Sequence, residues 1–160
     1  MIYAIGDIHG MLDPLKVLAD YLYDRKAQGE RVSKVIFLGD YIDCGPSSKE
    51  VTDLILKLQQ DFEVIALLGN HEEMMLSYYH KSFNHIKSGN MWLGYNGGVS
   101  TVRSFYPGSV LFKNGQYPDE KTVSEALFYQ DVLQLEAPYD AFFSSLTISH
   151  KVVLERQEQN

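Results

Sequence analysis

The sequence predicts an α/β fold in which the first half of the chain forms a parallel sheet. Apolar runs at residues 2–5, 32–38 and 62–68 are short and rich in aliphatic side chains, which is typical of buried strands. Successive runs begin about thirty residues apart, the length of one strand–helix–strand unit. The order β-α-β-α-β implies parallel strands joined by right-handed crossovers.

The segment between the first two strands predicts an amphipathic helix. Asp13 has a side chain suited to an N-cap, Pro14 suits the first helical position, and Gly29 follows the last turn. We expect the buried face of this helix to comprise Leu15, Leu18, Tyr21 and Leu22.

The segment before the third strand predicts a second helix. Ser47 and Glu50 have the spacing of a capping box, in which both side chains bond to backbone N–H groups of the first turn. The apolar stripe of this helix comprises Val51, Leu54, Ile55 and Leu58.

The rest of the chain has weaker patterns. Helices are predicted at residues 72–79, 122–133 and 139–146, a short strand at 152–154, and irregular structure at 82–98, which is rich in Asn, Gly and Ser. No repeat or linker divides the sequence, so we expect residues 1–160 to form a single domain.

Composition narrows the classes of function. The net charge of −7, without clusters of Lys or Arg, argues against binding to nucleic acid. No apolar run approaches the ~20 residues that span a bilayer, and no signal peptide is recognised. Cys44 is the only cysteine, which excludes an internal disulfide and suits a reducing cytoplasm.

Polar clusters follow each of the three predicted strands. They have the sequences Gly-Asp-Ile-His-Gly at 6–10, Gly-Asp-Tyr-Ile-Asp at 39–43 and Gly-Asn-His-Glu at 69–72. Ligands of open α/β sheets bind at the carboxyl ends of the strands, where all three clusters are expected to meet. The clusters therefore predict a shared site.

The residue types in these clusters predict a metal site. Asp7 and His9 alternate at a strand end and can point to the same side, and the carboxylate of Asp40 can bridge two cations. Asn70 adds a neutral oxygen ligand from the third strand. Carboxylate, imidazole and amide ligands suit Mn, Fe or Zn.

A catalytic role follows from the neighbouring residues. Two cations about 3.5–4 Å apart can activate a water for in-line attack on phosphorus. His71 follows Asn70 and can donate a proton to the leaving oxygen, while Asp43 can orient His71.

The three motifs together resemble the signature motifs of the calcineurin-like metallophosphoesterases, and most closely those of the bacterial serine/threonine-phosphatase-like branch. Trp92, residues 96–98 and Thr101 resemble a further stretch common in bacterial members. The resemblance implies a β-sandwich of two sheets flanked by helices, with a dinuclear metal centre.

The resemblance also implies a role for each site residue. Asp7, His9 and Asp40 would bind the first metal, and Asp40 and Asn70 the second, with Asn70 also contacting substrate. The pair formed by His71 and Asp43 would supply the proton. The implied activity is hydrolysis of phosphomonoesters or of phosphoserine and phosphothreonine in proteins.

The sequence departs from the family in the second motif. The family usually has an Arg after the position of Asp43, and this Arg grips the substrate phosphate. The chain has Cys44 there, which lacks the planar cation that binds phosphate in a bidentate manner. We expect weaker phosphate binding or a different substrate.

The sequence also lacks two histidines that family members supply late in the chain to the second metal. His150 is the only late histidine, and it is not followed by the small residues of the family motifs. We therefore expect a weakened second metal site and an incomplete second sheet. The apolar surface left exposed would favour a homodimer.

Two alternatives stay open at this point. Cys44 and the missing histidines are compatible with a non-catalytic module that binds metal or phosphate. Within enzymes, a pyrophosphohydrolase acting on diadenosine tetraphosphate is compatible with the same motifs. A panel of substrates would separate these functions.

Overall fold

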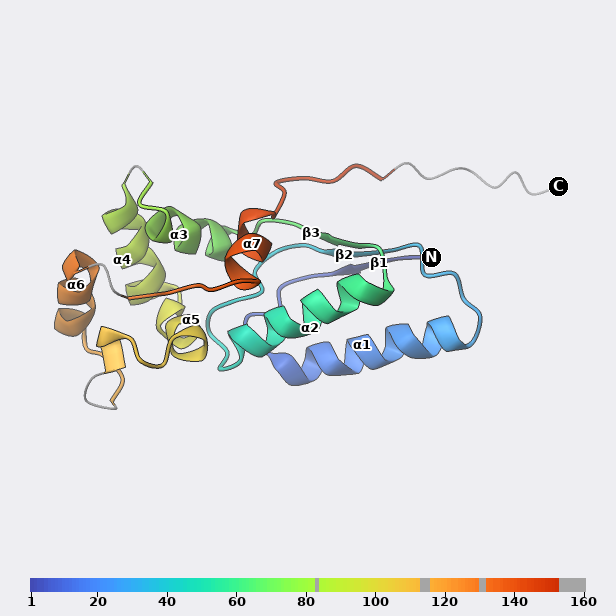
Figure 1. The fold of residues 1–160 in the computed structure, drawn as a ribbon, viewed down its shortest axis with the longest axis horizontal. Helices are drawn as coiled ribbons and strands as arrows, with labels where there is room; N and C mark the ends of the chain where they lie inside the picture. The colour runs from blue at the N-terminus through green and yellow to red at the C-terminus, as the bar shows by residue number, and fades with distance from the viewer. Residues whose placement is uncertain (83, 113–115, 130–131, 153–160) are drawn as a thin grey trace.

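A three-stranded parallel sheet forms the centre of the computed structural model, which describes residues 1–82, 84–112, 116–129 and 132–152 (Figure 1). The strand order is β1 (Ile2–Ile5), β2 (Lys34–Phe37) and β3 (Val64–Ala66). Ile2 pairs with Lys34, and Val35 pairs with Val64. The α/β fold and the β-α-β-α-β order predicted from the sequence are confirmed.

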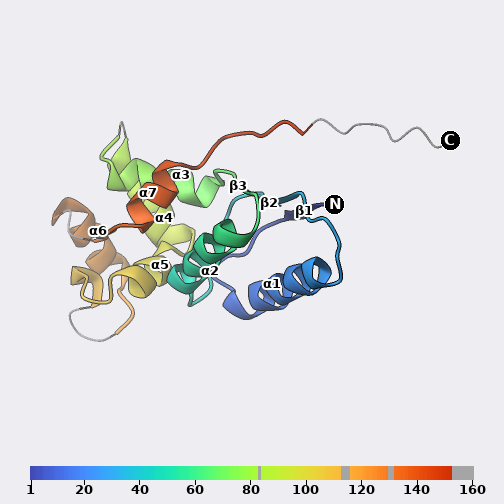
Figure 2. The same cartoon turned by 45° about the vertical axis from the view of Figure 1, so that its right-hand side comes forward.

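Helices account for most of the remaining described residues. They are α1 (Leu12–Ala27), α2 (Ser48–Asp61), α3 (Asn70–Tyr79), α4 (His85–Tyr95), α5 (Gly98–Phe105), the 3₁₀ helix η1 (Val110–Phe112), α6 (Glu120–Tyr129) and α7 (Tyr139–Ser144). In Figures 1 and 2, α1 and α2 lie along one side of the sheet, and α3 to α6 gather beyond the carboxyl ends of the strands.

The two crossover helices bury apolar faces. The α2 stripe agrees with the predicted one, since Val51, Ile55 and Leu58 are fully buried. In α1 the buried face comprises Leu15, Ala19 and Leu22, so the expected burial of Leu18 and Tyr21 was wrong. Burial of each large aliphatic side chain contributes about 1.5–3 kcal/mol.

The predicted helix caps are only partly present. Ser47 occupies the N-cap position of α2, but its side chain makes no capping hydrogen bond, so the capping box is not formed. Helix α1 begins at Leu12 with Met11 as N-cap, two residues before the predicted N-cap Asp13.

The irregular structure predicted at 82–98 was wrong over most of its length, because α4 occupies it. Asn, Gly and Ser disfavour an isolated helix, but packing overrides propensity here. Helix α4 packs against α3, α5 and α6, and the rings of Tyr78 and Trp92 lie 6.2 Å apart.

A second sheet is not formed by the described residues. Beyond the three strands, a single parallel bridge joins Leu67 to Thr147, after α7. Val152 has no regular structure, and the remainder of the strand predicted at 152–154 lies outside the described residues.

The ends of β2 and β3 approach each other at two glycines. A Cβ on Gly39, which has a φ of +107°, would lie 2.6 Å from the backbone of Gly69. A Cβ on Gly69 would in turn meet the backbone and carboxylate of Asp40. Because real Cβ contacts are never this short, both positions require glycine, and the loops after β2 and β3 are in direct backbone contact.

A buried carboxylate holds these two loops together. Glu72 Oε1 accepts hydrogen bonds from the backbone N–H groups of Tyr41 (2.8 Å) and Ile42 (3.2 Å), and Oε2 accepts those of Asp40 (2.9 Å) and Gly69 (3.2 Å). Burial raises the pKa of Glu72 to about 7, and the hydrogen bonds from the backbone oppose this rise. The side chain thus fixes the backbone on which Asp40 lies.

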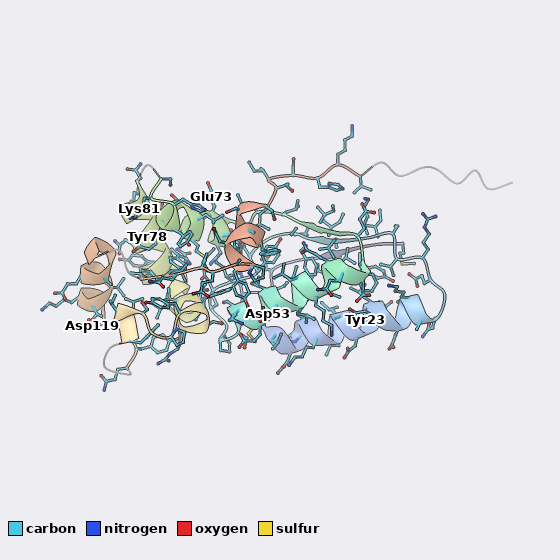
Figure 3. All side chains as sticks on the ribbon, in the orientation of Figure 1. Tyr23, Asp53, Glu73, Tyr78, Lys81 and Asp119 are labelled. Atoms are coloured by element: carbon cyan, nitrogen blue, oxygen red, sulfur yellow. The ribbon has the colours of Figure 1, made fainter. Side chains whose placement is uncertain are left out.

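We predict that Glu72→Gln lowers the free energy of unfolding by about 2–5 kcal/mol, because one oxygen becomes an NH₂ group facing two N–H donors. The matched control is Glu73→Gln on the same helical turn, where the side chain is exposed (Figure 3). It should change the free energy by no more than about 0.5 kcal/mol. Urea unfolding that gives equal values for both variants would contradict this role of Glu72.

Candidate metal centre

Side chains from three loops meet at the carboxyl edge of the sheet. His9 follows β1, Asp40 follows β2, and His71 lies in the first turn of α3. One ligand atom from each of the three lies within 4.8 Å of the others, and all three residues are partly buried. The loops predicted to share a site are therefore adjacent.

His9 is held in one orientation by its backbone and ring. Its N–H and that of Ile8 donate to the carbonyl of Asp40, both at 2.9 Å. Its ring Nδ1 lies 3.1 Å from the carbonyl oxygen of Ile42 and, as the donor of this bond, carries the proton. With a proton on Nδ1, Nε2 is the ring nitrogen that can offer a lone pair to a metal.

Asp40 lies at the amino end of α3. Its Oδ1 accepts a hydrogen bond from the backbone N–H of His71 at 3.1 Å. The unpaired N–H groups and the dipole of a helix favour negative charge at this end. Asp40 therefore presents its carboxylate beside the two imidazoles.

Asp43 and His71 form a hydrogen-bonded pair. His71 Nδ1 lies 2.7 Å from Asp43 Oδ2, and Asp43 is fully buried. Thr101 Oγ1 donates to Asp43 Oδ1 at 2.6 Å, and Trp92 Nε1 lies 3.0 Å from both carboxylate oxygens. Burial raises the pKa of Asp43, and the hydrogen bonds from Thr101, His71 and Trp92 counteract that rise.

Trp92 and Thr101 were marked in the sequence only as part of a family stretch, without a role. They come from α4 and α5, and both are fully buried. A buried tryptophan N–H needs an acceptor, which is the signal that could have assigned Trp92 a polar partner. The helices that the sequence did not predict thus supply the groups that surround Asp43.

Asp7 and Asn70 are exposed and lie close to residues of the centre in the sequence. Asp7 follows β1 by two residues, and Asn70 is the first residue of α3. The group within 4.8 Å comprises His9, Asp40 and His71 and does not include Asp7. The metal roles of Asp7 and Asn70 remain predictions.

His150 is exposed and lies in the segment after α7. In Figures 1 and 2 this segment runs toward the amino ends of the strands, away from the loops that carry His9 and Asp40. This arrangement gives no support for His150 as a replacement for the missing histidine ligands of the second metal.

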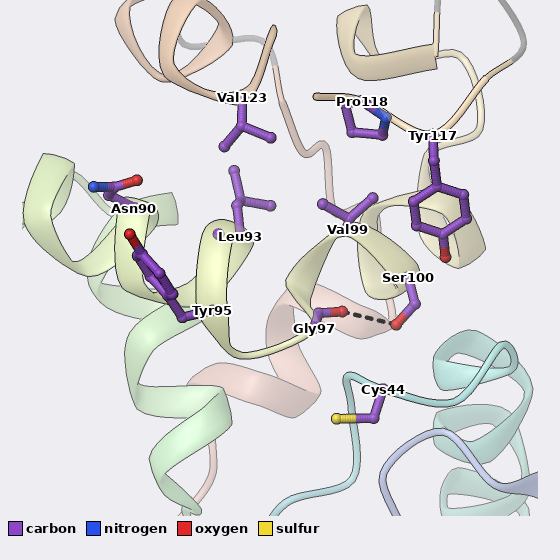
Figure 4. Close-up of a pocket in the computed structure, with 11 residues that line it drawn as sticks. Cys44, Asn90, Leu93, Tyr95, Gly97, Val99, Ser100, Tyr117, Pro118 and Val123 are labelled. Carbon is purple, nitrogen blue, oxygen red and sulfur yellow. Dashed lines mark hydrogen bonds between the residues drawn. The ribbon is translucent and has the colours of Figure 1, made fainter. Parts of the chain in front are cut away.

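Cys44 lies at the border between the metal centre and a cavity of about 550 Å³ (Figure 4). Burial raises the pKa of its thiol, and the carboxylates of Asp43 and Asp40 raise it further. The thiol is therefore uncharged near neutral pH. The position offers no cation to a phosphate group.

No helix of the described residues is long and apolar enough to cross a membrane.

Curated relatives match about half of the chain. The symmetrical bis(5'-nucleosyl)-tetraphosphatase of Pseudomonas putida strain GB-1 is 32% identical over 78 residues, which cover 49% of this chain and 25% of the relative. The one from Wigglesworthia glossinidia brevipalpis is 38% identical over 81 residues, covering 49% and 27%. The serine/threonine-protein phosphatase 4 catalytic subunit of Eremothecium gossypii is 32% identical over 93 residues, covering 54% and 28%. The matched segment thus spans about a quarter of each relative.

Similarity to solved structures is weak. The crystal structure of a hypothetical protein from Pyrococcus horikoshii OT3 aligns with 83% of this chain and 48% of its own, with a TM-score of 0.44 and 19% identity. This likeness carries no argument about function.

The comparison with protein families covers nearly the whole chain. The model of the calcineurin-like phosphoesterases matches residues 1–158. The match includes the three loops that bring His9, Asp40 and His71 together. The chain therefore belongs to the calcineurin-like phosphoesterase family.

Proposed function

We propose that this protein hydrolyses phosphomonoesters in a metal-dependent reaction and that it belongs to the bacterial serine/threonine-phosphatase-like branch of the family. The observation that carries the proposal is the convergence of His9, Asp40 and His71 beside the buried carboxylate of Asp43. Family membership supports the reaction class.

The donors fit a divalent ion of the Mn, Fe or Zn type. Imidazole and carboxylate are the groups that these ions prefer, and the Nδ1 bond of His9 leaves Nε2 for coordination. Asp7, His9 and Asp40 would hold a first ion, and Asp40 with Asn70 a second, which we expect to bind more weakly. When bound, such ions supply Lewis acidity and a nucleophilic water at neutral pH.

His71 would act as the general acid in this proposal. Its Nδ1 is engaged with Asp43, so the opposite ring nitrogen is directed away from that carboxylate. A buried carboxylate stabilises the imidazolium form and fixes the ring, as in other histidine–carboxylate pairs. His71 would then donate a proton to the leaving oxygen as the ester bond breaks.

A second candidate activity has support from the relatives. Symmetrical bis(5'-nucleosyl)-tetraphosphatases are among the proteins to which this chain is similar. In contrast, a binding module without activity would explain the lack of an Arg at Cys44. Comparing turnover of p-nitrophenyl phosphate and of diadenosine tetraphosphate, with calorimetry for metal binding, separates the three functions.

Further expectations concern the cellular location, the substrate and the oligomeric state of the protein. We infer a cytoplasmic location from the single cysteine and a phosphorylated protein or small phosphoester as substrate. A homodimer would form through the sheet surface near the exposed side chains of Ala4 and Leu38.

We predict that Asp40→Asn lowers the metal content of the purified protein and reduces kcat/KM on p-nitrophenyl phosphate with Mn²⁺ by at least about 100-fold, because a ligand is lost. Asp20→Asn, at an exposed position of α1, serves as the control and should match the unmodified protein. Elemental analysis and phosphatase assays on all three proteins provide the measurement. Equal metal content and equal activity in Asp40→Asn and the unmodified protein would contradict the proposal.

We also predict that Cys44→Arg tightens product inhibition by inorganic phosphate about tenfold, since a charge-assisted hydrogen bond contributes roughly 1.5–3 kcal/mol. The control is Cys44→Gln, which adds a long side chain without charge. The inhibition constant for phosphate is measured for each variant. An unchanged constant in Cys44→Arg would place residue 44 away from the phosphate.

A further inference from the structure

The cavity beside Cys44 is large enough to bind part of a small molecule. Its volume of about 550 Å³ falls within the roughly 300–1,000 Å³ of typical ligand sites. Its walls come from α4, the turn between α4 and α5, α5, the chain that leads into α6, and α6 itself (Figure 4).

The cavity adjoins the metal centre through one residue. Cys44 is the only residue of the loop after β2 that lines it, and Cys44 directly follows Asp43, the partner of His71. Gly97 packs against this point, because a Cβ there would lie 2.7 Å from the backbone nitrogen of Cys44. The cavity and the metal centre therefore meet at the loop that carries Asp43 and Cys44.

The described residues that line the cavity are uncharged. Leu93, Val99 and Val123 give the cavity apolar walls, and two further lining residues, Tyr95 and Tyr117, are 74% and 63% exposed. Exposed aromatic rings beside apolar walls favour a flat aromatic group. Lys and Arg are absent from these lining residues, and Arg103, whose guanidinium lies 4.9 Å from the centre of the Tyr117 ring, is not among them.

We propose that this cavity binds the flat, uncharged aromatic leaving group of a phosphomonoester whose phosphate lies at the metal centre. The position of the phosphate rests on the proposed function. The position of the ring is inferred from the cavity alone. The ring can belong to an aryl phosphate or to a nucleoside monophosphate, and the test distinguishes these two sources.

The single cysteine of the chain provides a direct readout of binding that does not require turnover. The rate of Cys44 alkylation by iodoacetamide is measured with 1-naphthol, with adenosine and with decahydro-1-naphthol, the saturated counterpart of naphthol. We expect at least one of the two aromatic compounds to slow alkylation fivefold or more, and the saturated compound to have less than a twofold effect. The more protective compound identifies the source of the ring.

Gly94 allows the cavity to be filled without disturbing the core. It lines the cavity, is exposed, and would carry a Cβ at an ordinary 3.5 Å from the Asn90 side chain. Gly94→Phe should abolish the protection of Cys44, whereas the matched control Gly94→Ala should retain it. Protection that is absent in the unmodified protein, equal for the saturated compound, or unchanged in Gly94→Phe would overturn the proposal.

Steady-state kinetics separate a failure of this inference from a failure of the proposed function. Gly94→Phe should raise KM for 1-naphthyl phosphate at least fivefold relative to Gly94→Ala and leave KM for glycerol 2-phosphate within twofold. Turnover without protection of Cys44 would contradict binding of the ring in the cavity and would leave the proposed phosphatase activity standing. Protection of Cys44 without turnover of any phosphoester would support binding of the ring in the cavity and contradict the proposed phosphatase activity.

Discussion

The candidate centre depends on the carboxylate of Glu72, which accepts hydrogen bonds from four backbone N–H groups in two loops. Three of them belong to the turn that carries Asp40, and the fourth belongs to Gly69 at the start of α3. Two strand ends and one helix are thereby fixed relative to one another. Because His71 lies on that helix, the same carboxylate sets the distance between His71 and Asp40.

The loops around this carboxylate adopt conformations that are unfavourable for residues with side chains. His9, Asp40, Asp43 and Cys44 have φ values of 46°, 52°, 74° and 60°. Such conformations cost of the order of 1–3 kcal/mol each and persist only where surrounding contacts impose them. Here the contacts are the bonds to Glu72, the N–H groups that donate to the Asp40 carbonyl, and the side chains around Asp43. Hydrogen bonds within the protein therefore hold these loops in their unfavourable conformations.

Local sequence patterns were sufficient to predict those parts of the structure that local interactions determine. Apolar runs placed the strands, and parallel topology then brought His9, Asp40 and His71 to one edge. The sequence could not predict α4, because its many polar and glycine residues form a helix only through packing around Trp92. The bonds of Glu72 to residues about thirty positions earlier, and a cavity bounded by α4, α5 and α6, depend on tertiary structure and leave no pattern in the chain.

In the proposed centre, the loops after β1 and β2 and the start of α3 together hold a divalent ion. The most direct test is an anomalous difference map from crystals grown with Mn²⁺. We expect a peak within bonding distance of His9 Nε2 and a carboxylate oxygen of Asp40. A map without a peak between these side chains, or with the ion bound by residues outside these loops, would contradict it.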